Sequence, residues 1–104
     1  MARLKWTPKA QSHLLSIYSY ISGDSEIYAK KFIERLIITI EKIPIFPEMG
    51  RVVPELAEYN LREVIFQNYR IVYRYLRNEH EVQILSIVHS ARDMRKIPAE
   101  EWRD

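Results

Sequence analysis

Arginine is concentrated in one stretch of the chain. Residues 60–77 hold four arginines and a single acidic residue, Glu63. The arginines in and around this stretch are Arg51, Arg62, Arg70, Arg74, Arg77, Arg92 and Arg95. The guanidinium group is planar, always charged and able to hold a phosphate through paired hydrogen bonds. Gathered on one surface, such side chains favour binding of a phosphodiester backbone. The alternative is a solvated strand face with weak surface ion pairs.

Histidine supplies one candidate for proton transfer. His89 ends the last expected strand and is followed by Ser90 and Arg92. An imidazole changes charge near neutral pH, so His89 could act as a general acid or base. A hydrogen-bonded histidine at a strand end is the alternative. His13 is expected at a helix surface or core edge, and His80 in a solvated turn.

Several other chemistries are excluded by what the chain lacks. It has no cysteine, so a disulfide, a thiol nucleophile and a cysteine-type zinc site are all impossible. No two histidines stand at helical metal-binding spacing, and the only glycines, Gly23 and Gly50, cannot form a phosphate-binding loop. The expected chemistry therefore needs no metal or cofactor, and is either a reaction on a phosphodiester or binding alone.

The first half of the chain has the pattern of a strand followed by two helices. Residues 2–6 are predicted to form the strand, and an apolar stripe of helical spacing runs through each of the next two segments. A short connection between the helices predicts an antiparallel hairpin. Thr7 is expected to cap the start of the first helix, with Pro8 at its first position, and Gly23 to end it in a left-handed conformation. Asp24 or Ser25 is expected to cap the start of the second helix.

In the second half the apolar period changes to two. Strands are predicted at 60–66, 69–76 and 81–89, joined by tight links at 67–68 and 77–80. Together the two halves predict one α+β domain over residues 1–104. An N-terminal strand and an antiparallel two-helix hairpin should pack on one face of a mainly antiparallel sheet.

The central strand indicates which face the arginines occupy. Alternation places Tyr69, Ile71, Tyr73 and Tyr75 on one side, and Arg70, Val72 and Arg74 on the other. Only the face beneath the helices has to be apolar in an antiparallel sheet. The arginine side is therefore expected to be the face that the helices leave uncovered.

The remaining features of the sequence indicate where in the cell the protein is expected to be. No run reaches the roughly 18 apolar residues that a membrane span needs, and the N-terminus lacks the apolar core of a signal peptide. With no cysteines, the chain is expected to be cytoplasmic and not associated with a membrane. Its formal net charge of +2 is small, so a nucleic-acid argument depends on where the charges lie.

Four sequence stretches carry a family resemblance. They are "GRVVPEL" (50–56), "LREV" (61–64), "NYRIVYR" (68–74) and "ILSIVHSARD" (84–93). In this order behind a two-helix N-terminus, they resemble the RelE/ParE superfamily of bacterial toxin–antitoxin toxins. The resemblance covers nearly the whole chain. It implies a compact toxin neutralised by a cognate antitoxin, whose extended C-terminal segment wraps either the basic face or the groove beside the helices.

Within this superfamily, the RelE-like branch cuts messenger RNA on the ribosome, and this is the leading hypothesis. Arg70 and Arg92 match that branch's phosphate-binding arginines. His89 would transfer a proton, with Glu55 or Glu63 as its partner. The side chains that would hold the RNA backbone are Arg51, Arg62 and Arg74. The chain would then be a metal-independent, ribosome-dependent endoribonuclease.

The ParE-like branch provides the first alternative, a noncatalytic poison of DNA gyrase. "ILSIVHSARD" resembles the last strand of ParE at least as closely, and Leu61 and Glu63 stand where RelE carries lysines. On this hypothesis Arg95 and Trp102 in the tail form binding surface, unless Trp102 packs over the edge of the core. The second alternative is a nontoxic RNA-binding or antitoxin-binding module.

Overall fold

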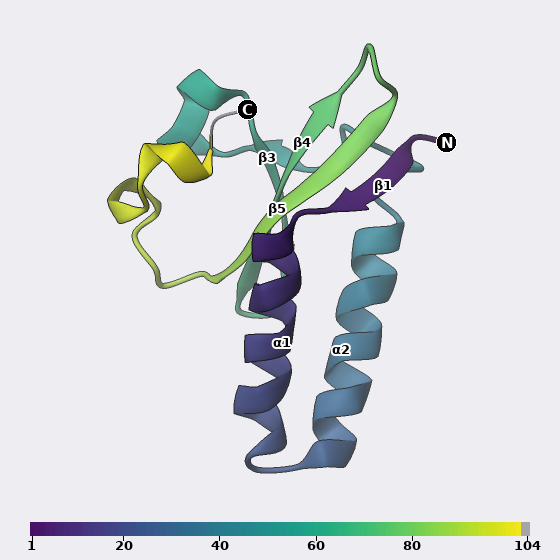
Figure 1. The fold of residues 1–104 in the computed structure, drawn as a ribbon, viewed down its shortest axis with the longest axis vertical. Helices are drawn as coiled ribbons and strands as arrows, with labels where there is room; N and C mark the ends of the chain where they lie inside the picture. The colour runs from purple at the N-terminus through teal and green to yellow at the C-terminus, as the bar shows by residue number, and fades with distance from the viewer. Residues whose placement is uncertain (103–104) are drawn as a thin grey trace.

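Along the chain, one strand and two antiparallel helices come first, and the other four strands of the sheet follow (Figure 1). The computed structural model describes residues 1–102. Its strands are β1 (Arg3–Trp6), β2 (Arg51–Val52), β3 (Arg62–Phe66), β4 (Tyr69–Leu76) and β5 (Glu81–His89). Its helices are α1 (Pro8–Ser22), α2 (Glu26–Glu41) and the short 3-10 helices η1 (Pro54–Tyr59), η2 (Met94–Lys96) and η3 (Ala99–Glu101).

The strands form a single mixed sheet in the order β1-β5-β4-β3-β2. Strand β1 is parallel to β5, and the other neighbours are antiparallel. Helices α1 and α2 form an antiparallel hairpin that extends beyond the end of the sheet (Figure 1). The predicted α+β architecture is confirmed. Neither α-helix in residues 1–102 has the length and apolar content needed to cross a membrane.

Both α-helices begin where the sequence predicts. The Thr7 side chain accepts a hydrogen bond from the Ala10 amide, with Pro8 in the first turn, and Ser25 accepts from the Tyr28 amide. The left-handed conformation predicted for Gly23 is wrong, because its φ of −57° is right-handed. The turn closes instead through the Asp24 and Ser25 amides, which both donate to the Ile21 carbonyl.

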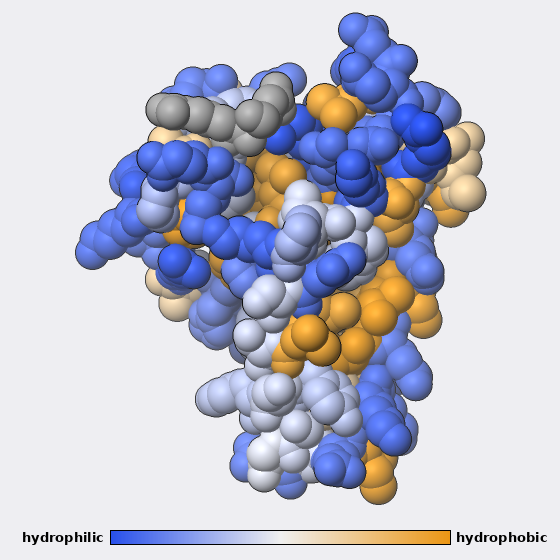
Figure 2. All heavy atoms as spheres, in the orientation of Figure 1, coloured by the Kyte–Doolittle hydropathy of each residue, from blue (hydrophilic) through white to orange (hydrophobic). Residues whose placement is uncertain are grey.

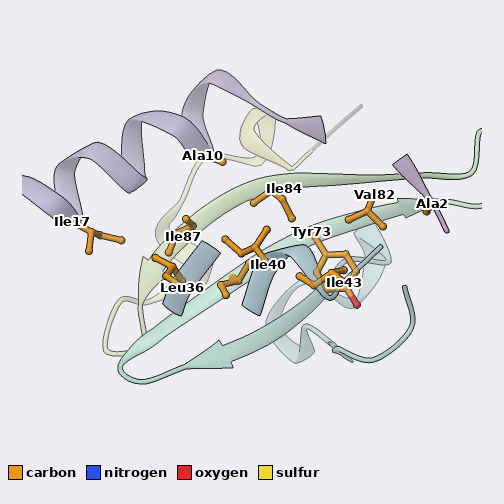
Figure 3. Close-up of a cluster of buried hydrophobic side chains, with 11 residues drawn as sticks. Ala2, Ala10, Ile17, Leu36, Ile40, Ile43, Tyr73, Val82, Ile84 and Ile87 are labelled. Atoms are coloured by element: carbon orange, nitrogen blue, oxygen red, sulfur yellow. The ribbon is translucent and has the colours of Figure 1, made fainter. Parts of the chain in front are cut away.

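Between the helical hairpin and the sheet lies the main core. Leu36 and Ile40 of α2 are fully buried there with Ile71 and Tyr73 of β4 and Ile84 of β5 (Figure 3). The predicted assignment of Ile71 and Tyr73 to the helix face is therefore correct. Fully burying a large apolar side chain contributes about 1.5–3 kcal/mol, so this layer supplies much of the stability.

The opposite face of the sheet is also covered, which corrects the prediction of an open arginine surface. Helix η1 and the C-terminal segment that follows β5 pack across it (Figure 1). Buried on this side are Val53, Leu56, Leu61, Val72, Leu85, Val88, Met94, Ile97 and Trp102. Strands β4 and β5 thus present apolar residues to both faces, and the tail folds back to remove the second set from water.

An extra residue in β5 changes the face of the sheet on which the later side chains of that strand lie. Val72 pairs with Ser86 but Tyr73 pairs with Ile84, so Leu85 is inserted as a β-bulge. Leu85 and Ser86 then both lie on the tail-covered side, and every later residue of β5 is shifted by one. Ile87 returns to the main core beneath the helices.

Candidate functional site

Arg70 is buried and lies at the centre of a network of charged side chains. Its Nε donates to Glu63 at 2.5 Å, and its two terminal nitrogens donate to the Glu55 carboxylate at 2.8 and 2.9 Å. Arg51 completes the network, with its Nε donating to the other Glu63 oxygen at 2.7 Å. The residues Arg51, Glu55, Glu63 and Arg70 form what we call the charged network.

The strand register brings this network together. Glu63 of β3 pairs with Val72 of β4 and with Arg51 of β2, so both arginines flank it on the tail-covered face. Glu55 comes from the first turn of η1, directly after Pro54. The network therefore joins η1 to three strands through ionic hydrogen bonds, which are stronger than neutral ones.

Charge is balanced within the network, with two arginines and two glutamates. Hydrogen bonding from Arg70 is the main cause that lowers the pKa of Glu55 to about 2, from an ordinary 4.5. The same pair raises the pKa of Arg70, with a further contribution from Glu63. Glu55 is consequently a weak base that stays ionised at neutral pH, and a poor candidate for taking a proton from a substrate.

Arg62 and Arg74 do not join Arg70. Arg74 is buried on the tail-covered side and donates to the Trp102 carbonyl oxygen. Arg62 pairs with Tyr73, so it lies on the helix face, where it donates to the Gly50 carbonyl at 2.7 Å. The three predicted backbone-binding arginines therefore fall in three places. Among them Arg51, whose side chain is 62% exposed, has the most contact with solvent.

His89 and Arg70 lie on opposite faces of the sheet. His89 pairs with Tyr69, which faces the helices, and their rings meet edge to face at 5.6 Å. The His89 Nδ1 accepts a hydrogen bond from the Ala91 amide at 3.1 Å. The Arg92 amide in turn donates to the His89 carbonyl at 3.0 Å. Of the three predicted catalytic residues, His89 and Arg92 are exposed in one turn, and Arg70 is buried on the face of the sheet opposite to His89.

Exposed positive charge is gathered instead in the turn that follows β5. We use the term basic turn for residues 89–96, where the exposed ionisable side chains are His89, Arg92, Asp93, Arg95 and Lys96. Met94 is fully buried and anchors this turn to the tail-side core. Asp93 caps η2 by accepting from the Arg95 amide at 3.0 Å. The turn thus presents its basic groups from a fixed backbone.

Sequence reasoning missed two partners that the fold supplies. The Glu55–Arg70 pair joins residues fifteen apart in different elements, and no local pattern indicates it. The His13 Nδ1 accepts the Ile87 amide of β5 at 3.1 Å. Burial, and then the charges of Lys9 and Arg92, lower the pKa of His13. Trp102 is 1% exposed, so it packs in the core and is not available as binding surface.

Comparisons with known proteins agree with this architecture. The family model described as "ParE toxin of type II toxin-antitoxin system, parDE" matches residues 4–94. The chain belongs to the ParE toxin family. The matched range includes the whole charged network and most of the basic turn. The predicted RelE/ParE superfamily is confirmed, and membership implies a cognate antitoxin as partner.

Two known proteins are similar to this ParE-family toxin over most of its length. It is 33% identical over 92 residues to "Toxin RelE2" of Caulobacter vibrioides, a match that covers 88% of this chain and 99% of the relative. A chain of the solved "Chromosomal ParDE TA system from P. aeruginosa" superimposes with a TM-score of 0.68 and 24% identity, over 86% of this chain and 96% of that one. The structural match shows that the two chains share a fold.

Proposed function

We propose that this toxin arrests growth by binding DNA gyrase in the cytoplasm, without catalysing a reaction of its own. The observation that carries the proposal is the state of Arg70. Its Nε and both terminal nitrogens donate to glutamates, and it is 6% exposed. A phosphate group therefore finds no open guanidinium edge at this position.

Freeing Arg70 for catalysis would be expensive. Leaving a buried charge without its partner is strongly destabilising, so any state in which Arg70 turns away must find another partner for the buried Glu63 carboxylate. A side chain that stabilises a transition state must be placed in advance of the reaction. Arg70 does have a fixed position, but its guanidinium group is directed at Glu55 and Glu63 and not at an open site.

The basic turn provides the surface for target binding. Arg92, Arg95 and Lys96 are exposed on a segment whose backbone is anchored by buried Met94 and Ile97. Figure 2 shows that hydrophilic side chains gather at the sheet end of the molecule, whereas the surface over α1 is paler. Charged, fixed surfaces of this kind favour fast and specific association with a macromolecular partner.

Ribosome-dependent cleavage of messenger RNA is the second candidate. Two observations favour it: His89 and Arg92 are both exposed in one backbone turn, and a relative bears the name "Toxin RelE2". In that case His89 would transfer the proton and Arg92 would bind the phosphate, without direct help from Arg70.

The two candidates are separated by inducing the toxin in a bacterial host without antitoxin. We expect DNA breaks while translation is initially intact, and cleaved DNA–gyrase complexes with the purified toxin. His89→Ala should remain toxic, whereas Arg92→Glu combined with Arg95→Glu should lose toxicity. Cut messenger RNA with intact DNA, together with loss of activity in His89→Ala, would overturn the proposal in favour of the second candidate.

A further inference from the structure

Arg62 carries a positive charge that no acidic side chain neutralises. Its Nη1 donates to the Gly50 carbonyl at 2.7 Å and to the Glu48 carbonyl at 3.3 Å. In the described part of the chain Arg62 has no carboxylate partner, whereas Arg51 and Arg70 are paired with glutamates. The side chain is half-buried, so water solvates its charge less fully than that of an exposed arginine. Its Nε and Nη2 are left for an acceptor from outside the chain.

A second arginine lies beside Arg62. The Arg77 Nη2 donates to the carboxylate of Glu48, the same residue whose backbone carbonyl holds Arg62. The Arg77 guanidinium carbon also lies 5.8 Å from the centre of the Tyr75 ring, within the range of a cation–π interaction. Glu48 therefore links the two arginines. Its single negative charge offsets only one of their two positive charges.

The two arginines line a small pocket together with Asn60 and Tyr75. The pocket has a volume of about 60 Å³, whereas about 10–15 Å³ is enough for one water molecule. It lies where β3 begins and β4 ends, far from the connection between α1 and α2 (Figure 1). We call it the arginine pocket. It is separate from the charged network, because Arg62 pairs with Tyr73 on the helix face and Arg70 lies on the other face.

The backbone beside the pocket is fixed from inside the fold. The hydroxyl of buried Tyr73 donates to the Pro47 carbonyl at 2.7 Å and accepts from the Gly50 amide at 3.0 Å. At Gly50 a Cβ atom would lie 2.6 Å from the Glu63 carbonyl oxygen, so a larger residue does not fit there without a shift of the backbone. The loop that holds Arg62 is therefore in position before a ligand arrives, which lowers the entropic cost of binding.

The arrangement of donors indicates the chemistry of the ligand. Guanidinium groups form paired, charge-assisted hydrogen bonds with oxyanions. A carboxylate has two oxygens, which one guanidinium group can already satisfy. A phosphate group has acceptors in more directions, so it can contact Arg62 and Arg77 at the same time. The excess positive charge of the pocket favours the same ligand.

We propose that the arginine pocket binds a phosphate group between Arg62 and Arg77, with Asn60 as a further polar contact. The same chemistry is present in inorganic phosphate and in the backbone of a nucleic acid, and the experiment distinguishes these two sources. This inference goes beyond the gyrase proposal and does not depend on it.

NMR titration of the purified toxin with inorganic phosphate tests the pocket. The Nε–H signals of Arg62 and Arg77 should shift and saturate, whereas that of Arg70, already bonded to Glu63, is the internal control. Sodium chloride at equal ionic strength controls for screening of charge. Shifts that do not saturate, or equal shifts with chloride, would overturn the proposal.

A parallel titration with a short single-stranded DNA oligonucleotide identifies the source of the phosphate. Saturation of the same two signals at a concentration at least about tenfold lower than that of inorganic phosphate assigns the pocket to a nucleic-acid backbone, since a polyanion also releases counterions on binding. Saturation by inorganic phosphate alone assigns it to the free anion. Both results support a phosphate pocket, and saturation by neither would contradict it.

Two variants remove donors but leave the bonds between Arg62 and the loop in place. Arg77→Gln should weaken phosphate binding at least about tenfold, because charge-assisted hydrogen bonds are lost. Asn60→Gly keeps the left-handed backbone, whose φ is 53°, and should weaken binding to a smaller extent. The matched control is Arg35→Gln on the exposed face of α2, which makes the same change in net charge as Arg77→Gln.

Equal phosphate binding by Arg77→Gln and Arg35→Gln, with folding confirmed by thermal unfolding, would overturn the proposal. Because binding is measured with the purified toxin alone, its failure leaves the gyrase proposal untouched.

Discussion

The two faces of the sheet are held by different kinds of interaction. Beneath α1 and α2, long regular elements bury a continuous apolar layer centred on Leu36, Ile40 and Tyr73. On the other face, short 3-10 segments cover a smaller apolar cluster and a charged network whose central members, Glu63 and Arg70, are buried. Apolar packing tolerates local adjustment, whereas a buried charge depends on every one of its partners. The tail-covered face should therefore be the more sensitive to single polar substitutions.

The largest expected effect comes from removing the central acid of the charged network. Glu63→Ala should lower the free energy of unfolding by about 3–5 kcal/mol, because it leaves buried Arg70 without one partner. Urea unfolding measures the change. Glu34→Ala, at an exposed position on α2, is the control and should change stability by less than about 0.5 kcal/mol.

A second variant shows whether charge is the cause. Adding Arg70→Met to Glu63→Leu removes both members of the pair and should recover most of the lost stability. If the double variant is as unstable as Glu63→Ala, packing volume and not unpaired charge explains the loss.

On the helix face, Leu36→Ala should lower the free energy of unfolding by about 2–5 kcal/mol through lost burial and a new cavity. Leu36 is 0% exposed. Ile38→Ala on the same helix removes a side chain that is 53% exposed and should cost less than about 1 kcal/mol. Equal losses would show that this layer does not carry the apolar stability assigned to it.

Acid should weaken the tail-covered face. The pKa of Glu55 falls from 4.5 unfolded to about 2 folded, so its stabilising contribution is complete above 4.5 and is lost as pH falls through 2. Glu55→Gln should flatten the pH dependence of stability in this range. Glu58→Gln on the same short helix is the control and should leave the dependence unchanged.

The smallest effect concerns His13, which joins α1 to β5. Its pKa lies below the ordinary 6.5 in the folded chain, so below pH 6.5 the unfolded chain gains a proton that the folded chain resists. The contribution of His13 is thus complete above pH 6.5 and declines as pH falls to its folded-state pKa. His13→Gln should remove this dependence, and His80→Gln in the exposed turn should not. Unfolding measured between pH 5 and 8 decides.

Local sequence pattern was sufficient for the helix face and the order of elements. The apolar stripe through α2, the caps at Thr7 and Ser25, and the strands at 69–76 and 81–89 all follow from residue type and spacing within a few turns. The alternation along β4 also placed Tyr73 correctly under the helices. These features depend on neighbours in the chain, which is why they can be predicted from the sequence.

The candidate site depended on the tertiary structure. Simple alternation from Ile84 would put His89 on the same face as Arg70, but the extra residue at Leu85 moves it to the other face. The glutamates that occupy Arg70 come from different elements, and the tail that covers them is fixed by Met94, Ile97 and Trp102. The sequence alone determined that arginines line one strand of a ParE-like fold. Whether those arginines meet solvent was decided by long-range register and packing, because burial and ion pairing depend on residues that are distant in the chain.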